Sequence, residues 1–213
     1  AMRKLFNGLL WIVGTLLVIG VVLRALVLDV WAVPDDPSLG ASIAPSLAPG
    51  DVVVVLTRGT PGFGELVRCP DPEVPGSHIV GRIAGVPGDT VEVDHRALVV
   101  NGQRYDAEVA CTEPKLSIVD PATNNTVQVT CDMVRMGPGL HLRATGRKPP
   151  LERRHRVEVR PDTVFLLSDN RSYHDDSRDF GLQPRAACSQ RIVFRLWGAG
   201  GWSDDQRRFT FVR

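Results

Sequence analysis

The sequence has no excess of either charge, because its 25 Lys and Arg residues almost balance its 24 Asp and Glu residues. Nucleic-acid binding relies on clustered positive charge, so this balance gives no reason to expect a nucleic-acid partner. The sequence also has no internal repeat, and its four cysteines lack the spacing of a metal site. With 213 residues and 43% hydrophobic content the chain can bury a core, and its function has to come from local sites.

One long apolar run lies near the N-terminus. The nineteen residues from Leu5 to Leu23 carry no charge and follow Arg3 and Lys4. A helix of this length approaches the thickness of a bilayer core. A cleaved signal peptide is the alternative, but the run is longer than a usual signal-peptide core and no A-x-A site follows it. The sequence therefore predicts a cytoplasmic N-terminus (residues 1–4) and a transmembrane anchor (residues 5–28).

The charges beside this run predict its orientation. Basic residues precede the run, and Asp29, Asp35 and Asp36 follow it. The rule that positive charge stays inside then places the N-terminus in the cytoplasm and the rest of the chain outside.

Beyond residue 28 the pattern is that of short strands rich in Val and Ile, separated by Gly, Pro, Asn or Asp, with no convincing soluble helix. The expected fold is mainly β, as a barrel or a pair of sheets. Residues 29–103 and 161–213 are expected to form the main β domain, and residues 104–160 an inserted subsidiary β lobe. The expected strands are Val52–Leu56, Glu65–Arg68, Ile79–Val86, Thr90–Val93, Leu98–Val100, Val127–Thr130, Val157–Val159, Thr163–Leu167, Ile192–Leu196 and Phe209–Val212.

The cysteines fit an oxidising compartment, where disulfides are stable. Cys111 and Cys131 flank a proposed turn, and we expect them to pair across it. Cys69 and Cys188 form either a second pair or two buried thiols. A basic run at residues 146–156 could touch anionic lipid, although a solvated loop is the better interpretation.

The stretch GASIAPSLAPGD, from Gly40 to Asp51, follows the apolar segment and contains the candidate nucleophile Ser42. On its own, this stretch could also be a turn with ordinary loop hydroxyls, since Pro and Gly mark turns. Two further motifs follow: GRIAGVPGD from Gly81 and SDNRSYHDDSRDFG from Ser168.

Together these motifs resemble type I signal peptidases, the membrane-bound serine proteases that remove signal peptides. Ser42 falls on the nucleophile of that family. The resemblance implies a signal-peptidase-like catalytic β domain on the outer side of the bacterial cytoplasmic membrane. It also implies specificity for small residues before the cut, and no cofactor. The other matching positions are Pro45, Leu47, Gly50, Asp51, Arg82, Gly85, Pro87, Gly88, Asp89, Asp169, Asn170, Arg171, Asp176, Ser177, Arg178 and Gly181.

The sequence departs from the family at its general base. The family has a Lys immediately before Arg82, and here that position is Gly81. The three lysines of the chain, Lys4, Lys115 and Lys148, offer no evident replacement. Gly40 also replaces a Ser hydroxyl of the oxyanion hole, which would then rely on backbone N–H groups such as that of Ser42.

A second substitution suggests a different base. The family commonly has a Ser where this chain has His174, and its hydroxyl contacts the lysine. His174 could reach into the space that Gly81 leaves empty and accept the proton of Ser42, with Asp176, or less favourably Asp175, orienting its ring. A histidine is already largely neutral at pH 7, so it needs less desolvation than a lysine.

We expect the remaining site residues either to bind substrate or to hold the catalytic residues in place. Ile43, Ala44, Ile79 and Ile83 could form shallow apolar substrate pockets, although a core role is equally compatible with them. His78 is another possible base, but it lies three residues from Gly81 and should face the opposite side of the strand. The residues expected to support the site are Arg82, Asp169, Asn170, Arg171, Ser177 and Arg178.

Two other functions stay open. An inactive homologue could bind signal peptides or membrane proteins as a chaperone or assembly factor, and the loss of the Lys favours it. A metal site at His174, Asp175, Asp176 and Asp179 is less favoured, because neighbouring carboxylates more often cap turns or pair with arginines. The expected partners are signal peptides of secreted preproteins, membrane lipid and possible protein-translocation machinery.

Overall fold

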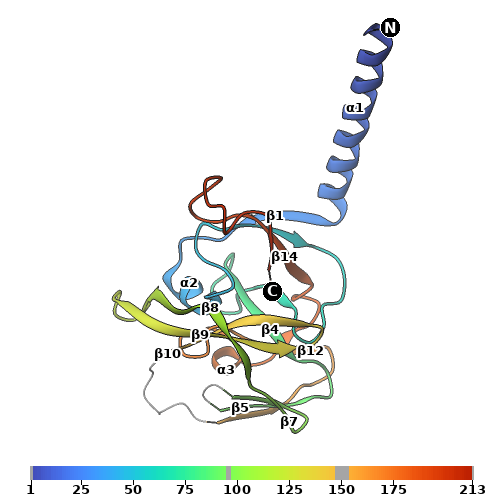
Figure 1. Ribbon diagram of the computed structural model, residues 1–213. Helices are drawn as coiled ribbons and strands as arrows, with labels where there is room; N and C mark the ends of the chain where they lie inside the picture. The colour runs from blue at the N-terminus through green and yellow to red at the C-terminus, as the bar shows by residue number, and fades with distance from the viewer. Residues whose placement is uncertain (1, 95–96, 147–153, 213) are drawn as a thin grey trace.

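The computed structural model describes residues 2–94, 97–146 and 154–212, and it is mainly β (Figure 1). Three helices accompany the strands: α1 (Met2–Leu26), α2 (Pro37–Ile43) and α3 (Ser177–Phe180). The mainly β class matches the expectation from the sequence, whereas the two short helices α2 and α3 were not expected.

Strands of the largest sheet contain or adjoin the three predicted site motifs: β2 follows the first, β4 contains the start of the second, and β12 precedes the third. Its strand order is β1-β2-β14-β3-β4-β12-β13, with β15 paired to β14, and neighbouring strands are antiparallel. The strands are β1 (Leu28–Ala32), β2 (Val52–Leu56), β3 (Leu66–Pro70), β4 (His78–Gly85), β12 (Thr163–Leu167), β13 (Gln183–Pro184), β14 (Gln190–Trp197) and β15 (Thr210–Phe211).

Two smaller sheets complete the β structure, with orders β10-β9-β8 and β11-β5-β6-β7. The first predicted boundary of the inserted lobe, at residues 103 and 104, falls inside β7, and β11 from that lobe pairs with β5 from outside it. The basic run at residues 146–156 lies mostly outside the described residues. The strands are β5 (Thr90–Asp94), β6 (Ala97–Val100), β7 (Gln103–Tyr105), β8 (Ala107–Val119), β9 (Thr126–Met136), β10 (Gly139–Gly146) and β11 (His155–Glu158).

A close backbone contact joins the largest sheet to the β9–β10 hairpin. Gly64, just before β3, has a φ of +87°, and a Cβ there would lie 2.3 Å from the carbonyl oxygen of Met136. Only glycine combines this conformation with such a close approach. The hairpin is thereby held against the start of β3, next to Arg82 of β4, whose guanidinium donates to the Gly64 carbonyl at 2.9 Å.

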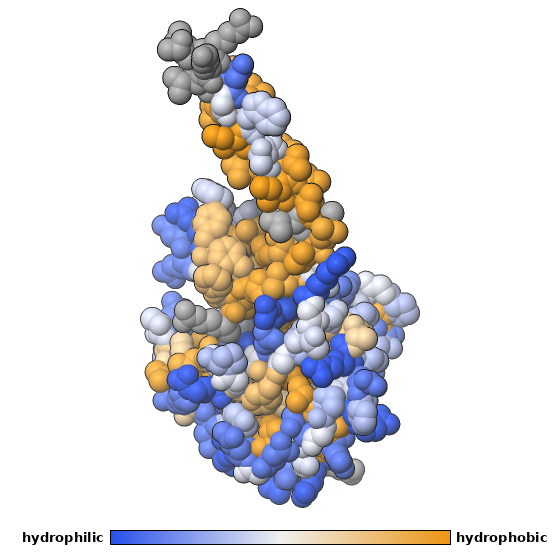
Figure 2. All heavy atoms as spheres, turned by 90° about the vertical axis from the view of Figure 1, so that its right-hand side faces the viewer, coloured by the Kyte–Doolittle hydropathy of each residue, from blue (hydrophilic) through white to orange (hydrophobic). Residues whose placement is uncertain are grey.

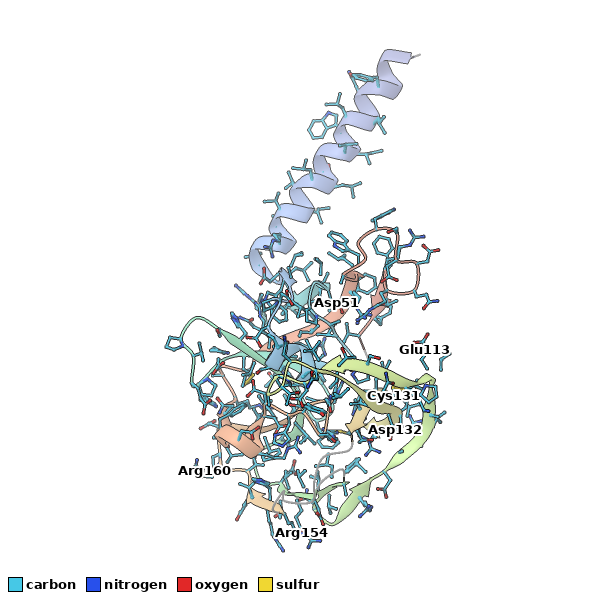
Figure 3. The ribbon with its side chains drawn as sticks, turned by 90° about the vertical axis from the view of Figure 1, so that its left-hand side faces the viewer. Asp51, Glu113, Cys131, Asp132, Arg154 and Arg160 are labelled. Atoms are coloured by element: carbon cyan, nitrogen blue, oxygen red, sulfur yellow. A yellow bond between two sulfur atoms is a disulfide. The ribbon has the colours of Figure 1, made fainter. Side chains whose placement is uncertain are left out.

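Both possible disulfides are present. Cys111 of β8 is bonded to Cys131 of β9, which confirms the expected pair. Figure 3 labels Cys131 within this hairpin. Cys69 of β3 is bonded to Cys188, just before β14, so the second pair also exists and links two neighbouring strands of the large sheet.

The helix α1 projects away from the β structure (Figure 1), and its surface is predominantly apolar (Figure 2). Its described apolar side chains are largely exposed, as in Leu16 at 63% and Leu17 at 64%. No helix among the described residues is long and apolar enough to cross a membrane, so the predicted anchor is not confirmed. At the base of the helix, Asp29 pairs with Arg24 at 2.5 Å and with Arg68 of β3 at 2.9 Å.

Candidate active site

The residue expected to be the nucleophile lies in the last turn of α2. Asp36 caps this helix by accepting a hydrogen bond from the Leu39 N–H at 2.9 Å, and Pro37 follows as its first residue. Ser42 is 1% exposed, and its Oγ donates to the Leu39 carbonyl at 3.0 Å. The hydroxyl is therefore turned back onto its own helix in this structure.

Asn170 brings the third sequence motif against this helix. Its side-chain amide donates to the Ala41 carbonyl at 2.9 Å, and its backbone N–H donates to the Ser42 carbonyl at 3.0 Å. Its side-chain oxygen accepts from the backbone N–H groups of Ser172 and Tyr173. One buried amide thus holds the end of α2 beside the loop that carries His174.

A buried ion pair lies beneath the same helix end. Arg82 donates two hydrogen bonds to Asp169, at 2.8 and 2.7 Å, and Ser46 donates to the same carboxylate at 2.5 Å. Burial acts to raise the pKa of Asp169, but the Arg82 guanidinium and the Ser46 hydroxyl outweigh it, and the pKa falls below its usual value. Asp169 therefore stays ionised and locks the second and third motifs together.

The loop after Ser42 is fixed at its far end by Asp51, which is fully buried (labelled in Figure 3). Its carboxylate accepts from Arg195 of β14 and from Arg207, each at 2.9 Å. It also accepts from the Ala48 N–H at 3.0 Å. These bonds tie the loop to the strand beside β2.

Asp176 has a structural role here. It caps α3, accepts from the Ser168 N–H at 2.8 Å, and takes two bonds from the Arg178 guanidinium at 2.9 and 2.8 Å. Burial opposes its ionisation, but Arg178 lowers the pKa of Asp176 well below its usual value. Ser177 accepts from the Leu166 N–H at 2.9 Å, so this segment is anchored to β12.

The carboxylate bonded to His174 is that of Asp179. His174 Nδ1 lies 2.7 Å from Asp179 Oδ2, whereas Asp176 was expected to orient the ring. The reason is that the oxygens of Asp176 are taken up by Arg178 and by backbone N–H groups. Burial acts to lower the pKa of His174, but the bond to Asp179 outweighs it and raises the pKa above its usual value. In the sequence the only signal for this pair was an acid five residues after the histidine.

His174 lines a cavity of about 930 Å³. The walls include Ser38 and Leu39 of α2, His78 at the start of β4, and Asp175. Burial, together with Asp179 and other neighbouring acids, raises the pKa of Asp175 to about 6. His78 thus faces the same cavity as His174, and neither this nor the presence of Ser38 was anticipated from the sequence.

Ser42 and His174 lie on segments that Asn170 joins, but their side chains are not hydrogen-bonded to each other among the described residues. Ser42 is absent from the described walls of the cavity, and within the described residues its hydroxyl makes no hydrogen bond with His174. The sequence predicts that Gly81 leaves a space for His174. A Cβ at position 81 would lie 3.1 Å from the Cβ of Leu166, so the space beside Gly81 is already occupied. A side chain at position 81 would therefore require the neighbouring Leu166 of β12 to shift slightly.

Most of the expected substrate-binding side chains belong to the core. Ile79 and Ile83 are 2% and 0% exposed and pack with Val67 and Leu166. Ile43 is 1% exposed and packs in a second core cluster. Ala44 differs, since it lines a separate groove of about 520 Å³ between α2 and β8.

One group of possible metal ligands is present among the described residues. Single ligand atoms of His174, Asp176 and Asp179 lie within 4.8 Å of one another. Asp176 is already saturated by Arg178 and backbone N–H groups, so this set is better explained by ion pairing and helix capping.

Comparisons with known proteins identify the family of the chain. A family model described as "Signal peptidase, peptidase S26" matches residues 7–197. A probable signal peptidase I-1 of Synechocystis sp. is 25% identical over 207 residues, which cover 92% of this chain and 84% of that protein.

A signal peptidase IB of Staphylococcus aureus is 30% identical over 118 residues, and the match spans 55% of this chain and about half, 52%, of that protein. The crystal structure of a signal peptidase I from Enterococcus faecalis covers 64% of this chain and 99% of its own, with 20% identity and a TM-score of 0.39. Since the family model covers most of the sequence, the chain belongs to the signal peptidase family S26 and is a signal peptidase I-like protease.

Proposed function

We propose that this protein is a membrane-bound serine endopeptidase that removes signal peptides from translocated preproteins, with Ser42 as nucleophile and His174 as general base. The observation that carries the proposal is the double hydrogen bond from Asn170 to the end of α2. It holds the serine segment beside the histidine loop, although the two are far apart in the sequence.

The proposed chemistry needs one local movement. The Ser42 hydroxyl leaves the Leu39 carbonyl by rotating to another staggered χ1 position, toward the cavity lined by His174. The Ser42 proton then passes to the His174 ring as Oγ bonds to the scissile carbonyl carbon. His174 returns the proton to the leaving amine as the C–N bond breaks, and water hydrolyses the acyl-enzyme.

Asp179 takes the orienting role in this scheme. Its carboxylate, 2.7 Å from Nδ1, fixes the ring and stabilises the imidazolium that forms. Because the pKa of His174 is raised, the base form dominates only above a pH higher than for an ordinary histidine. The cleavage rate is expected to rise with pH through that raised pKa.

The helix α1 supports the membrane part of the proposal. Its described apolar side chains are exposed around it, as expected of a helix that lies against lipid. Lipid would cover these side chains, and Asp29, Arg68 and Trp31 would lie at the base of the helix near the lipid surface. The proposed location is the bacterial cytoplasmic membrane, with the β domain on its outer side and signal peptides as substrates.

A catalytically inactive, peptide-binding homologue is the second candidate. Two observations favour it. The Ser42 hydroxyl is hydrogen-bonded within α2, and a Cβ at position 81 would lie only 3.1 Å from the Cβ of Leu166. Its cavity would then hold a signal peptide without cutting it.

The test compares four forms of the full chain in lipid vesicles: the parent, Ser42→Ala, His174→Ala and the control His155→Ala, whose histidine lies in β11 away from the cavity. A preprotein with an A-x-A site is the substrate, across pH 5 to 9. Cleavage by the parent and control alone supports the proposed enzyme. Cleavage by His174→Ala at the parental rate rejects His174 as base. Binding of the signal peptide by an inert parent establishes the second candidate.

A further inference from the structure

A second pocket, of about 700 Å³, lies on another part of the domain. It is formed by the β14–β15 region on one side and the β9–β10 hairpin on the other, and it shares no described lining residue with the cavity at His174. The close contact between Gly64 and Met136 holds its two sides together. Arg82 of the second sequence motif lines this pocket, but the proposed peptide cleavage does not use it.

His141 of β10 lines this pocket and lacks hydrogen-bond partners. The residue is 3% exposed, and within the described part of the chain neither ring nitrogen has a partner. Buried polar groups are nearly always paired, so two unpaired ring nitrogens at a cavity wall indicate that something else pairs with them. A neutral imidazole can offer one N–H donor and one acceptor there.

The charged residues around His141 favour an anion. Arg82, Arg135 and Arg191 line the pocket with one lining acid, Glu65, and Arg82 is itself paired with the buried Asp169 behind the wall. Arg135 also pairs with Glu108 at 3.1 Å, and Arg191 pairs with Glu65. The side chains of Arg135 and Arg191 are 53% and 38% exposed, and both residues line the pocket.

The same surroundings keep the His141 ring neutral. Burial lowers the pKa of His141 to about 2, and the positive charges of Arg82, Arg171 and Arg143 act in the same direction, while Asp169 opposes them. A bound anion would reverse part of this effect, because it would lie beside the ring and favour its charged form.

The rest of the pocket wall is apolar. It is formed by Leu56 of β2, Leu66 of β3, Ile192 of β14 and Val212 near the C-terminus, with Met136 and Leu140 on the hairpin side.

We propose that this pocket binds a single-chain carboxylate amphiphile, such as a fatty acid, with the carboxylate at His141 and the acyl chain along the apolar wall. A carboxylate is favoured over a phosphate because a single charge loses less hydration next to one neutral imidazole N–H. This site is separate from the proposed cleavage site, so its test does not depend on peptidase activity.

The experiment measures binding of dodecanoate to the full chain in a neutral maltoside detergent, by equilibrium dialysis against empty micelles. In parallel, NMR of the ¹⁵N-labelled imidazole rings follows His141. We expect saturable binding of one dodecanoate and a shift of the His141 ring signals. Methyl dodecanoate, which lacks the charge, and acetate, which lacks the chain, are expected to leave those signals in place.

The variants separate a binding role from a structural one. His141→Gln is expected to weaken dodecanoate binding at least tenfold, and Arg135→Gln several-fold, whereas His155→Gln binds like the parent. Parental affinity in His141→Gln, or equal shifts with methyl dodecanoate, overturns the proposal. If His141→Gln fails to fold, Arg135→Gln decides, because its half-exposed side chain tolerates replacement; parental affinity there also overturns the proposal.

Discussion

Removing Arg82 would leave the buried carboxylate of Asp169 without its charged partner and with only the Ser46 hydroxyl bonded to it. The two side chains are 4% and 0% exposed, and they are joined by two hydrogen bonds at 2.8 and 2.7 Å. Loss of one partner of such a buried pair costs about 3–5 kcal/mol, because the other charge stays buried without compensation. For a chain of this size, we expect the Tm of Arg82→Met to fall by about 6–20 °C.

The double variant Arg82→Met, Asp169→Leu is the control for this reasoning. It removes both charges, and replacing a buried pair by apolar side chains is often close to neutral. Most of the lost stability should therefore return in the double variant. Urea and thermal unfolding of the full chain in detergent would measure all three proteins.

The pH dependence provides an independent check. In the parent, the lowered pKa of Asp169 means that its contribution is present above its unfolded pKa and is lost as the pH falls through the folded value. Without Arg82, burial instead raises the pKa of Asp169, so the variant should lose less stability at pH 5 than at pH 8. A loss under about 1 kcal/mol, or one that grows on acidification, would refute the account of this pair.

Three further predictions concern the base, the hairpin and the missing lysine. Asp179→Asn removes the main influence that raises the pKa of His174, so the rising limb of the cleavage rate should move to lower pH; an unchanged profile contradicts the pairing. Replacing Cys111 and Cys131 by Ala opens a loop with a sequence separation of 20 residues and should cost about 3 kcal/mol in urea unfolding. Gly81→Lys should lower stability by about 1–3 kcal/mol, because its Cβ would crowd a buried leucine of β12; parental stability would show that the strand yields easily.

Much of the large sheet was predictable from local pattern. The strand Thr163–Leu167 was placed at its observed bounds, and Val52–Leu56 likewise, because Val-rich runs between turn residues are typical of buried strands. No bounds were predicted for the long hairpin strand β8, because most of its side chains are exposed and the alternation of apolar and polar residues is confined to short parts of it.

The candidate site was predictable at the level of motifs but not of pairings. Asp36 followed by Pro37 is a typical helix start, yet the Pro-rich surroundings led to the prediction of a turn. The pairing of His174 with Asp179 depends on Asp176 being occupied by Arg178, and no spacing in the sequence reveals that competition.

The two bonds from Asn170 also set an order of events during synthesis. The carbonyl groups they hold belong to residues 41 and 42, and the contact with Ala41 spans 129 positions of the chain. While the residues before Asn170, about four fifths of the polypeptide, leave the ribosome, α2 has no such support. The serine segment can take its final place only when the last fifth has emerged, so a nascent or truncated chain would lack an assembled candidate site.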